Sequence, residues 1–232
     1  MKQTISILVL IITFLSCSRQ KKYFEPSEIV DKTEEYIQTN KSWIELNNKE
    51  RIDGYTRIGD SIFGGEIACN VKPLPDIDIK TFKVLAGTQY AKDKNHVFYP
   101  LEILCIDYDD CGVCYYKKVI VEKANPLKFK YLGKDYATDE KNVYFRGELI
   151  SKADGKTFKI INGPEFFYFA VDINNVFVHE KVIENADPLT FYYDKNDTRN
   201  IDTEYQYIYI IGDKNSEWEF IPPKTINEIE KK

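Results

Sequence analysis

Three stretches of the chain share one pattern, and this pattern decides the fold: Tyr90-Ala91-Lys92-Asp93-Lys94-Asn95-His96-Val97, Tyr136-Ala137-Thr138-Asp139-Glu140-Lys141-Asn142-Val143 and Phe169-Ala170-Val171-Asp172-Ile173-Asn174-Asn175-Val176. In each stretch an aspartate lies three residues after an aromatic residue and four before a valine. A more divergent fourth copy runs from Asp213 to Phe220. Asp can bond the backbone N–H two residues on, and Asn or His tolerates a left-handed backbone. The pattern therefore predicts a tight hairpin turn between two strands.

A second motif separates these hairpins. An Asn or Asp followed by Pro resembles a helix N-cap with proline at the first helical position, so each spacer is expected to form one helical turn. The phenylalanine that ends the spacer is expected to anchor the core. The copies are Ala124-Asn125-Pro126-Leu127-Lys128-Phe129, Ala153-Asp154-Gly155-Lys156-Thr157-Phe158, Ala186-Asp187-Pro188-Leu189-Thr190-Phe191 and, in part, Asp78-Ile79-Lys80-Thr81-Phe82.

The two motifs together predict a mainly β fold of tandem β-hairpin repeats with one-turn helical spacers, plus one short N-terminal α-helix over 27–39. Arg146-Gly147 predicts a second, two-residue turn within a unit. One such unit cannot bury its apolar face alone, so neighbouring units must stack. We expect two interior ladders: the valines Val97, Val143 and Val176, and the phenylalanines Phe82, Phe129, Phe158 and Phe191.

The repeated Asp93-Lys94-Asn95, followed by Val97-Phe98-Tyr99 and by the spacer motif, resembles the DKNYY repeat family. The resemblance covers about Tyr55 to Phe220. Ile62 to Ile67 echoes Tyr144 to Leu149, so a degenerate unit is expected before the clear ones. The family resemblance implies a repeat scaffold and little specific chemistry.

One long segment interrupts the repeats. Val97 and Phe129 are 32 residues apart, whereas Val143 and Phe158 are 15 apart, so the first unit carries an insertion within 100–118. Function tends to lie on loops that interrupt a regular scaffold, and this one offers carboxylates and aromatic contact area. The candidate binding residues are Asp107, Tyr108, Asp109, Asp110, Tyr115 and Tyr116.

Four cysteines remain after Cys17: Cys69, Cys105, Cys111 and Cys114. In an exported chain they favour disulfides, with three possible connectivities. The spacing of Cys111 and Cys114 leaves a zinc site or a redox pair as alternatives. Asp107, Asp109 and Gly112 are similar to part of a calcium loop, but the spacing departs from the EF-hand pattern and its terminal Glu is missing. We expect no metal and no cofactor.

The N-terminus has the features of an export signal. A basic start, Met1 to Thr4, precedes an apolar run from Ile5 to Leu15, which is too short to span a bilayer. Leu15-Ser16-Cys17 resembles the lipobox of bacterial lipoproteins, which implies acylation at Cys17 and a firm membrane anchor. An ordinary signal peptide with a chance cysteine is the alternative. By the same resemblance, Ser18 favours the outer membrane, and residues 19–22, which are basic or polar and lack an acidic surface-export cluster, favour its periplasmic face.

The expected organisation has five parts. They are a signal peptide (1–16), a tether (17–26), an N-terminal helical segment (27–54), a repeat domain (55–221, with the insertion 100–118) and a polar, frayed tail (222–232).

Catalysis finds little support in the sequence. The chain has only two histidines: His96 lies at the turn position of Asn142, and His179 is expected to be a solvated surface residue. Neither a nucleophilic triad nor a phosphate-binding glycine loop can be assembled. The repeated aspartates Asp93, Asp139, Asp172 and Asp213 recur because the turn recurs. A net charge of −5 argues against nucleic acid as a partner.

The leading functional hypothesis is therefore a non-catalytic, membrane-anchored interaction lipoprotein with an unknown protein partner. An immunity-type lipoprotein that captures a toxin belongs to this class, since an acidic chain suits a basic toxin. The alternative is an envelope carbohydrate-binding or glycan-active protein. Tyr205, Tyr207 and Tyr209 alternate, which places them on one face of a strand as candidate exposed aromatics. A purely structural envelope protein is the third hypothesis.

Overall fold

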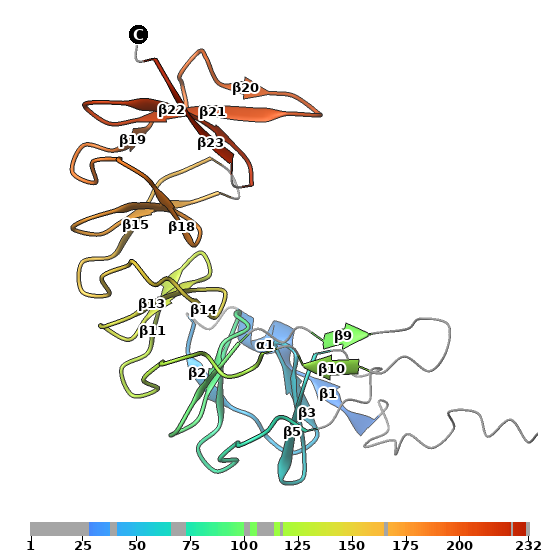
Figure 1. Cartoon of the computed structure of the whole chain (residues 1–232). Coiled ribbons are helices and arrows are strands. Elements are labelled where there is room, and N and C mark those ends of the chain that lie inside the picture. Colours follow the sequence, from blue (N-terminus) through green and yellow to red (C-terminus); the bar gives the residue numbers. More distant parts are fainter. Residues whose placement is uncertain are drawn as a thin grey trace, which may run out of the picture.

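Small, mostly antiparallel sheets form a curved array (Figure 1), in which the last three four- and five-stranded sheets follow one another in chain order. This computed structural model describes residues 28–37, 41–65, 73–99, 103–105, 114–116, 118–164, 167–223 and 225–230, with only the backbone for Ile37, 103–105 and 114–116. Within this part of the chain strands dominate and helix is scarce. The predicted mainly β fold of stacked repeat units is confirmed.

The first two sheets are interleaved along the chain. The first has the order β1-β3-β4-β5, with β1 (Val30–Asp31), β3 (Glu50–Ile52), β4 (Tyr55–Ile58) and β5 (Ser61–Gly64). The second has the order β2-β6-β7-β8, with β2 (Trp43–Glu45), β6 (Lys83–Leu85), β7 (Ala91–Lys92) and β8 (Val97–Phe98). Because β2 pairs with β6 and β3 pairs with β4, the segment before the clear repeats ties the two sheets together.

The N-terminal helix begins later than expected. Among the described residues, helix α1 covers Thr33–Ile37, because Val30 and Asp31 instead pair in parallel with Glu50 and Arg51. The Asp31 carboxylate accepts the Thr33 N–H at 2.9 Å, which caps the helix where the strand ends. The segment 27–54 therefore contributes three strands as well as a helix.

The next two sheets are regular four-stranded meanders. One contains β11 (Lys130–Gly133), β12 (Tyr136–Thr138), β13 (Val143–Phe145) and β14 (Glu148–Leu149). The other contains β15 (Lys159–Ile161), β16 (Phe169–Val171), β17 (Val176–Val178) and β18 (Lys181–Ile183). The turn between β13 and β14 places Arg146 at φ 48° and Gly147 at φ 76°, as a two-residue hairpin turn requires.

The last sheet contains β19 (Tyr192–Tyr193), β21 (Tyr207–Gly212), β22 (Glu217–Ile221) and β23 (Thr225–Ile229), and β20 (Ile201–Asp202) pairs with β21 beside it. The expectation of a frayed tail from Pro222 is wrong for β23, which pairs with β22 from Thr225 to Ile229. Ile226 lies opposite Phe220 in this pairing and packs against the core of the last unit.

The insertion replaces one turn of the second sheet. Tyr99 N–H donates to the Val119 carbonyl at 2.7 Å and Val121 N–H to the Val97 carbonyl at 2.8 Å, so the chain leaves the sheet after Tyr99 and re-enters it at Val119. Residues 100–118 thus stand where Arg146-Gly147 stands in the next unit. Within them, β9 (Ile103–Cys105) and β10 (Cys114–Tyr116) form a separate two-stranded hairpin.

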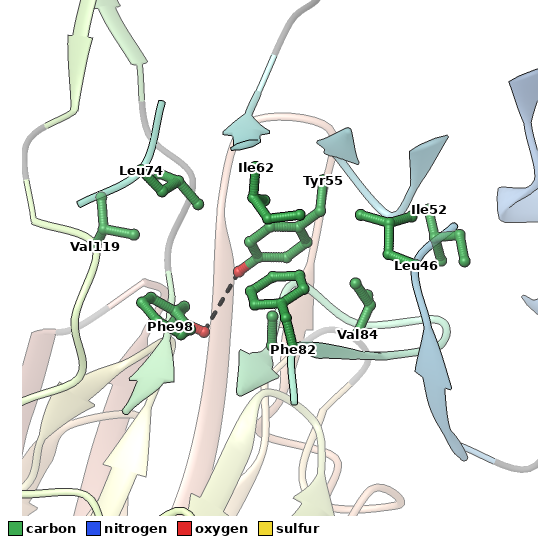
Figure 2. Packing of buried hydrophobic residues seen from close by; sticks show 10 residues of the cluster. Leu46, Ile52, Tyr55, Ile62, Leu74, Phe82, Val84, Phe98 and Val119 are labelled. Atoms are coloured by element: carbon green, nitrogen blue, oxygen red, sulfur yellow. Dashed lines mark hydrogen bonds between the residues drawn. The ribbon is translucent and has the colours of Figure 1, made fainter. Parts of the chain in front are cut away.

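The two expected ladders lie in the interior. Val97, Val143 and Val176 are fully buried. The phenylalanines Phe82, Phe129 and Phe158 are 3–8% exposed, and Phe191 is partly buried. Figure 2 shows the first cluster, in which the Phe82 ring meets Tyr55 edge-on with 5.6 Å between centroids.

Buried tyrosines also link successive units. The Tyr55 hydroxyl donates to the Gln89 carbonyl at 2.8 Å, Tyr90 to Asp135 at 3.2 Å and Tyr136 to His179 at 3.0 Å. Phe169 occupies the equivalent position in the third clear unit and packs against Phe191 and Phe220 instead. Burial raises the pKa of Tyr90 and Tyr136, so both hydroxyls stay protonated and donate.

Candidate functional site

The four repeated aspartates are buried, and their carboxylates accept hydrogen bonds mainly from backbone N–H groups. In the third unit, one Asp172 oxygen accepts the N–H groups of Asn174 and Asn175, both at 2.7 Å, and the other accepts the Asp154 N–H at 2.8 Å. The first two bonds close the hairpin turn, and the third holds the spacer against it. We call this arrangement the aspartate clamp.

The clamp recurs in every unit that carries the motif. The N–H that each spacer donates comes from Asp78 to Asp93 (2.8 Å), from Asn125 to Asp139 (3.0 Å), from Asp154 to Asp172 (2.8 Å) and from Asp187 to Asp213 (2.6 Å). Burial acts to raise the pKa of Asp139 and Asp213, but their N–H bonds outweigh it and lower each pKa below its ordinary value. These charged carboxylates therefore serve as acceptors in the fold, as the recurrence predicted.

A threonine hydroxyl completes most clamps. The spacer threonines Thr81, Thr157 and Thr190 each accept the N–H of the residue after the clamp aspartate, at 3.0 to 3.2 Å. The second unit has Lys128 at this spacer position, and there Thr138 on β12 accepts the Glu140 N–H at 3.0 Å. Where the spacer has no threonine, the equivalent N–H therefore donates to a threonine hydroxyl on the strand.

The expected role of the turn asparagines is wrong. Among the described residues of these turns, Glu140 has a positive φ, whereas Asn142, Asn175 and His96 do not. Asn175 instead donates from its side-chain amide to the Lys152 carbonyl at 3.2 Å, and Asn142 does the same to Lys123 at 3.4 Å. Each asparagine therefore ties its hairpin to the turn before the spacer.

His179 also differs from its expected solvated state. It is half-buried and stacks on Phe145, with 4.7 Å between ring centroids and an interplanar angle of 10°. Its φ of 52° places it in the same turn position as Arg146. Its contacts are those of an inter-unit packing residue.

The fourth unit breaks the valine ladder with a charged residue. Glu217 stands four residues after the clamp aspartate, where the other units have valine, yet it is only 4% exposed. Arg199 donates to both of its carboxylate oxygens, at 2.7 and 3.2 Å, and Tyr192 donates to one at 2.9 Å. Hydrogen bonds to Asp197 and then to Glu217 raise the pKa of Arg199, so the guanidinium stays charged.

This ion pair fixes a second interruption of the repeat, which the sequence analysis missed. Residues 194–206 lie between β19 and β21 and carry β20. Arg199 binds Asp197 within the segment through Nε and Nη2, and Asn200 accepts the Ile210 N–H at 2.9 Å. Thr203 closes the hairpin tip by accepting the Gln206 N–H at 3.0 Å. A glutamate at a ladder position, with extra chain length before it, was the available signal.

The hairpin 201–208 projects from the last sheet (Figure 1). Its exposed side chains include apolar and acidic ones. Tyr205 is 90% exposed, Ile201 46% and Tyr207 45%. Tyr209 differs from the expectation of three exposed tyrosines, because it is partly buried against Tyr193 and Phe220. Asp202 pairs directly with Tyr207 across the hairpin. We call this element the C-terminal hairpin.

Most residues singled out in the insertion lie outside the described residues, as do Cys69 and the lipidation candidate Cys17. Those of the insertion are Asp107, Tyr108, Asp109, Asp110 and Cys111. Strands β9 and β10 include Cys105, Cys114, Tyr115 and Tyr116, and the register places Cys105 opposite Cys114.

Among the described side chains, no three His, Cys, Asp or Glu residues gather as a metal site would require. In the same ranges, no helix has the length and apolar character needed to cross a membrane.

A comparison with protein-family models matches the model of the DKNYY family over residues 2–102 and 107–168. The chain belongs to the DKNYY family. The gap between the matched segments falls inside the insertion, and the last sheet of this DKNYY protein lies beyond them. No curated protein and no solved structure matches the chain.

Proposed function

We propose that this DKNYY protein is a non-catalytic interaction module of the bacterial envelope that binds a partner protein through its C-terminal hairpin. The observation that carries the proposal is the exposure of Tyr205, Tyr207 and Ile201 on a hairpin that the ion pair between Arg199 and the buried Glu217 holds in place. Tyrosine and arginine dominate the binding energy at protein interfaces, and a tyrosine has few rotamers to lose.

The rigid attachment of the hairpin supports this function. A segment that must order itself on binding loses affinity, whereas a pre-ordered one does not. Here the ion pair fixes the base of the hairpin and Thr203 fixes its tip. The regular part of the scaffold, by contrast, uses its repeated carboxylates for its own backbone.

The charge of the hairpin supports a basic partner. Asp202 and Glu204 are exposed beside the tyrosines, and Arg199 is neutralised by Asp197 and Glu217. Arginine or lysine side chains of a partner could pair with these carboxylates and lie over the tyrosine rings. An immunity-type role, in which the protein captures a basic toxin, is one form of this proposal.

The membrane anchor is part of the same proposal. It rests on the apolar run from Ile5 to Leu15 and on Cys17, which the lipobox resemblance makes the acylated residue. Ser18 supports the outer membrane, and the lack of an acidic cluster in the basic or polar residues 19–22 supports its periplasmic face. Replacing Cys17 with Ala should move the protein from the membrane fraction to the soluble fraction.

Carbohydrate binding is the second candidate function, and one observation favours it. Asp202 lies directly opposite Tyr207, so a carboxylate acceptor stands beside an exposed aromatic ring. Sugars combine such stacking with hydroxyl hydrogen bonds. A glycan array with the purified protein would separate this candidate from protein binding.

The test compares capture by matched variants. Envelope proteins are cross-linked to the full chain and quantified for wild type, for Tyr205→Ser/Tyr207→Ser and for the control Leu127→Ser/Leu189→Ser. The control removes two apolar side chains that are at least 85% exposed, on spacers away from the hairpin. We expect the tyrosine variant to lose a specific partner at least about tenfold and the control to retain it. Equal capture by both variants would exclude the C-terminal hairpin as the binding element.

The first interruption is tested in the same experiment. Replacing residues 100–118 by Arg-Gly copies the turn of the next unit and should leave the repeats folded. Loss of the partner in this variant alone would move the proposed contact to the insertion.

A further inference from the structure

The hairpin inside the insertion places two of the four cysteines directly opposite each other. In the β9–β10 register, Cys105 pairs with Cys114, Leu104 with Tyr115 and Ile103 with Tyr116. Directly opposed residues in an antiparallel pair have Cα atoms about 4.5 or 5.5 Å apart. Both spacings fall within the range of about 4.4–6.8 Å that a disulfide requires.

The position of the pair within the hairpin strengthens the inference. Cys105 is the last residue of β9 and Cys114 is the first of β10, so the two close the base of the loop 106–113. Pairing of the strands holds the two backbones together whichever redox state the thiols have. The register therefore selects one of the three connectivities that the sequence left open.

We propose that Cys105 and Cys114 form a disulfide that closes the loop 106–113. The reaction is thiol–disulfide exchange with a small-molecule or protein disulfide as oxidant. One cysteine thiolate attacks the donor disulfide and displaces the first donor thiolate, which takes up a proton. The second cysteine thiolate then attacks the mixed disulfide, which forms the Cys105–Cys114 bond and releases the second donor thiol. Two protein thiols are oxidised and one donor disulfide is reduced to two thiols.

The pairing is independent of the proposed partner, and mass spectrometry tests it directly. The full chain is equilibrated in glutathione redox buffer, alkylated, and digested without reduction by a protease that cleaves before aspartate. Cys105 then lies on the peptide that ends at Ile106, and Cys114 on the peptide that begins at Asp110. Because the second peptide also carries Cys111, fragmentation of the linked peptides must locate the bond, and we expect it at Cys114 both in wild type and in Cys111→Ser. An alkylated Cys105 in oxidised Cys111→Ser, or its linkage to Cys69, would overturn the proposal.

A second measurement tests whether the strand register brings the thiols together. In Cys69→Ser/Cys111→Ser, the equilibrium with glutathione gives the effective concentration of the pair. We expect this concentration to fall at least about tenfold in 8 M urea, where the strands are lost. Equal values in buffer and in urea would contradict a pair held by the hairpin.

Discussion

Val176 in the third unit and Glu217 in the fourth occupy the same position, four residues after the clamp aspartate, and both are buried. Around Val176 the contacts are apolar, as the stacked units require. Around Glu217 the chain supplies Arg199 and Tyr192, which come from or beside the extra segment 194–206. The same position therefore serves packing in one unit and attachment of an added element in the other.

This difference separates what the repeat needs from what it tolerates. The aspartate clamp is present in all four units, including the fourth, where the ladder residue has changed. A buried glutamate is acceptable only where its charge is paired and its oxygens are bonded. The clamp thus defines the scaffold, and the ladder position can be exchanged when an insertion brings a partner.

Placing the glutamate in the wrong unit should have the largest effect. Val176 is fully buried in a cluster of hydrophobic residues, so Val176→Glu places a carboxylate among apolar side chains. We expect a loss of about 3–5 kcal/mol in the free energy of unfolding, measured by urea titration. A change below about 1 kcal/mol would mean that the ladder position is not a closed apolar site in the third unit.

Breaking a clamp should have the next largest effect. Asp213→Asn keeps an oxygen for the N–H groups of Asn215 and Ser216 but turns an NH₂ group toward the Asp187 N–H. We expect a loss of about 1–3 kcal/mol, because a buried donor then lacks an acceptor. Asp202→Asn, on the exposed hairpin, is the control and should change stability by less than about 0.5 kcal/mol. Equal effects of the two changes would argue against the clamp.

The reciprocal substitution at the ladder position should change the free energy of unfolding little but loosen the attachment of the C-terminal hairpin. Glu217→Val restores the ladder residue of the other units and leaves Arg199, whose side chain is 34% exposed, paired with Asp197. Because the remaining cation keeps a partner and access to water, we expect a loss of less than about 1 kcal/mol in the free energy of global unfolding. Arg199 loses its anchor, so cleavage by trypsin at Lys195 and Arg199 should become faster. Unchanged cleavage with unchanged stability would show that the ion pair does not hold the segment.

The clamps also predict a modest acid dependence. Because the pKa values of Asp139 and Asp213 are lowered in the folded protein, their contribution is complete above the ordinary aspartate pKa of about 4. It is lost as the pH falls from there through the lower folded-state values. Asp139→Asn/Asp213→Asn should therefore show a shallower decline in the urea midpoint between pH 4 and pH 2 than wild type. Parallel declines would mean that other groups carry the acid sensitivity.

Local patterns made most of the scaffold predictable. The hairpin turns and spacers depend on a few adjacent residues, such as Asp172 with Asn174 and Asn175, so their signals survive in the sequence. The burial of Val143 and Phe158 follows from the same spacing. Stacking of units then follows because none can cover its own apolar face.

The features that sequence could not provide depend on distant partners. The pairing of β23 with β22 needs Ile226 to meet Phe220, and the short polar tail carries no turn signal for it. The role of Asn175 depends on a carbonyl 23 residues away, at Lys152. The second interruption could not be located from the motif spacing, because the divergent fourth copy lacks the valine that marks the other units.

The most direct test of the aspartate clamp is amide hydrogen exchange in Asp172→Asn. The Asp154 N–H donates to the Asp172 carboxylate, and the Asn125 N–H makes the equivalent bond to Asp139 in the neighbouring unit. Exchange at both amides is measured in wild type and variant, so that the second unit reports any global loss of stability. We expect protection of Asp154 to fall at least about tenfold more than that of Asn125. An unchanged ratio of the two protection factors would contradict a scaffold held by the repeated aspartates.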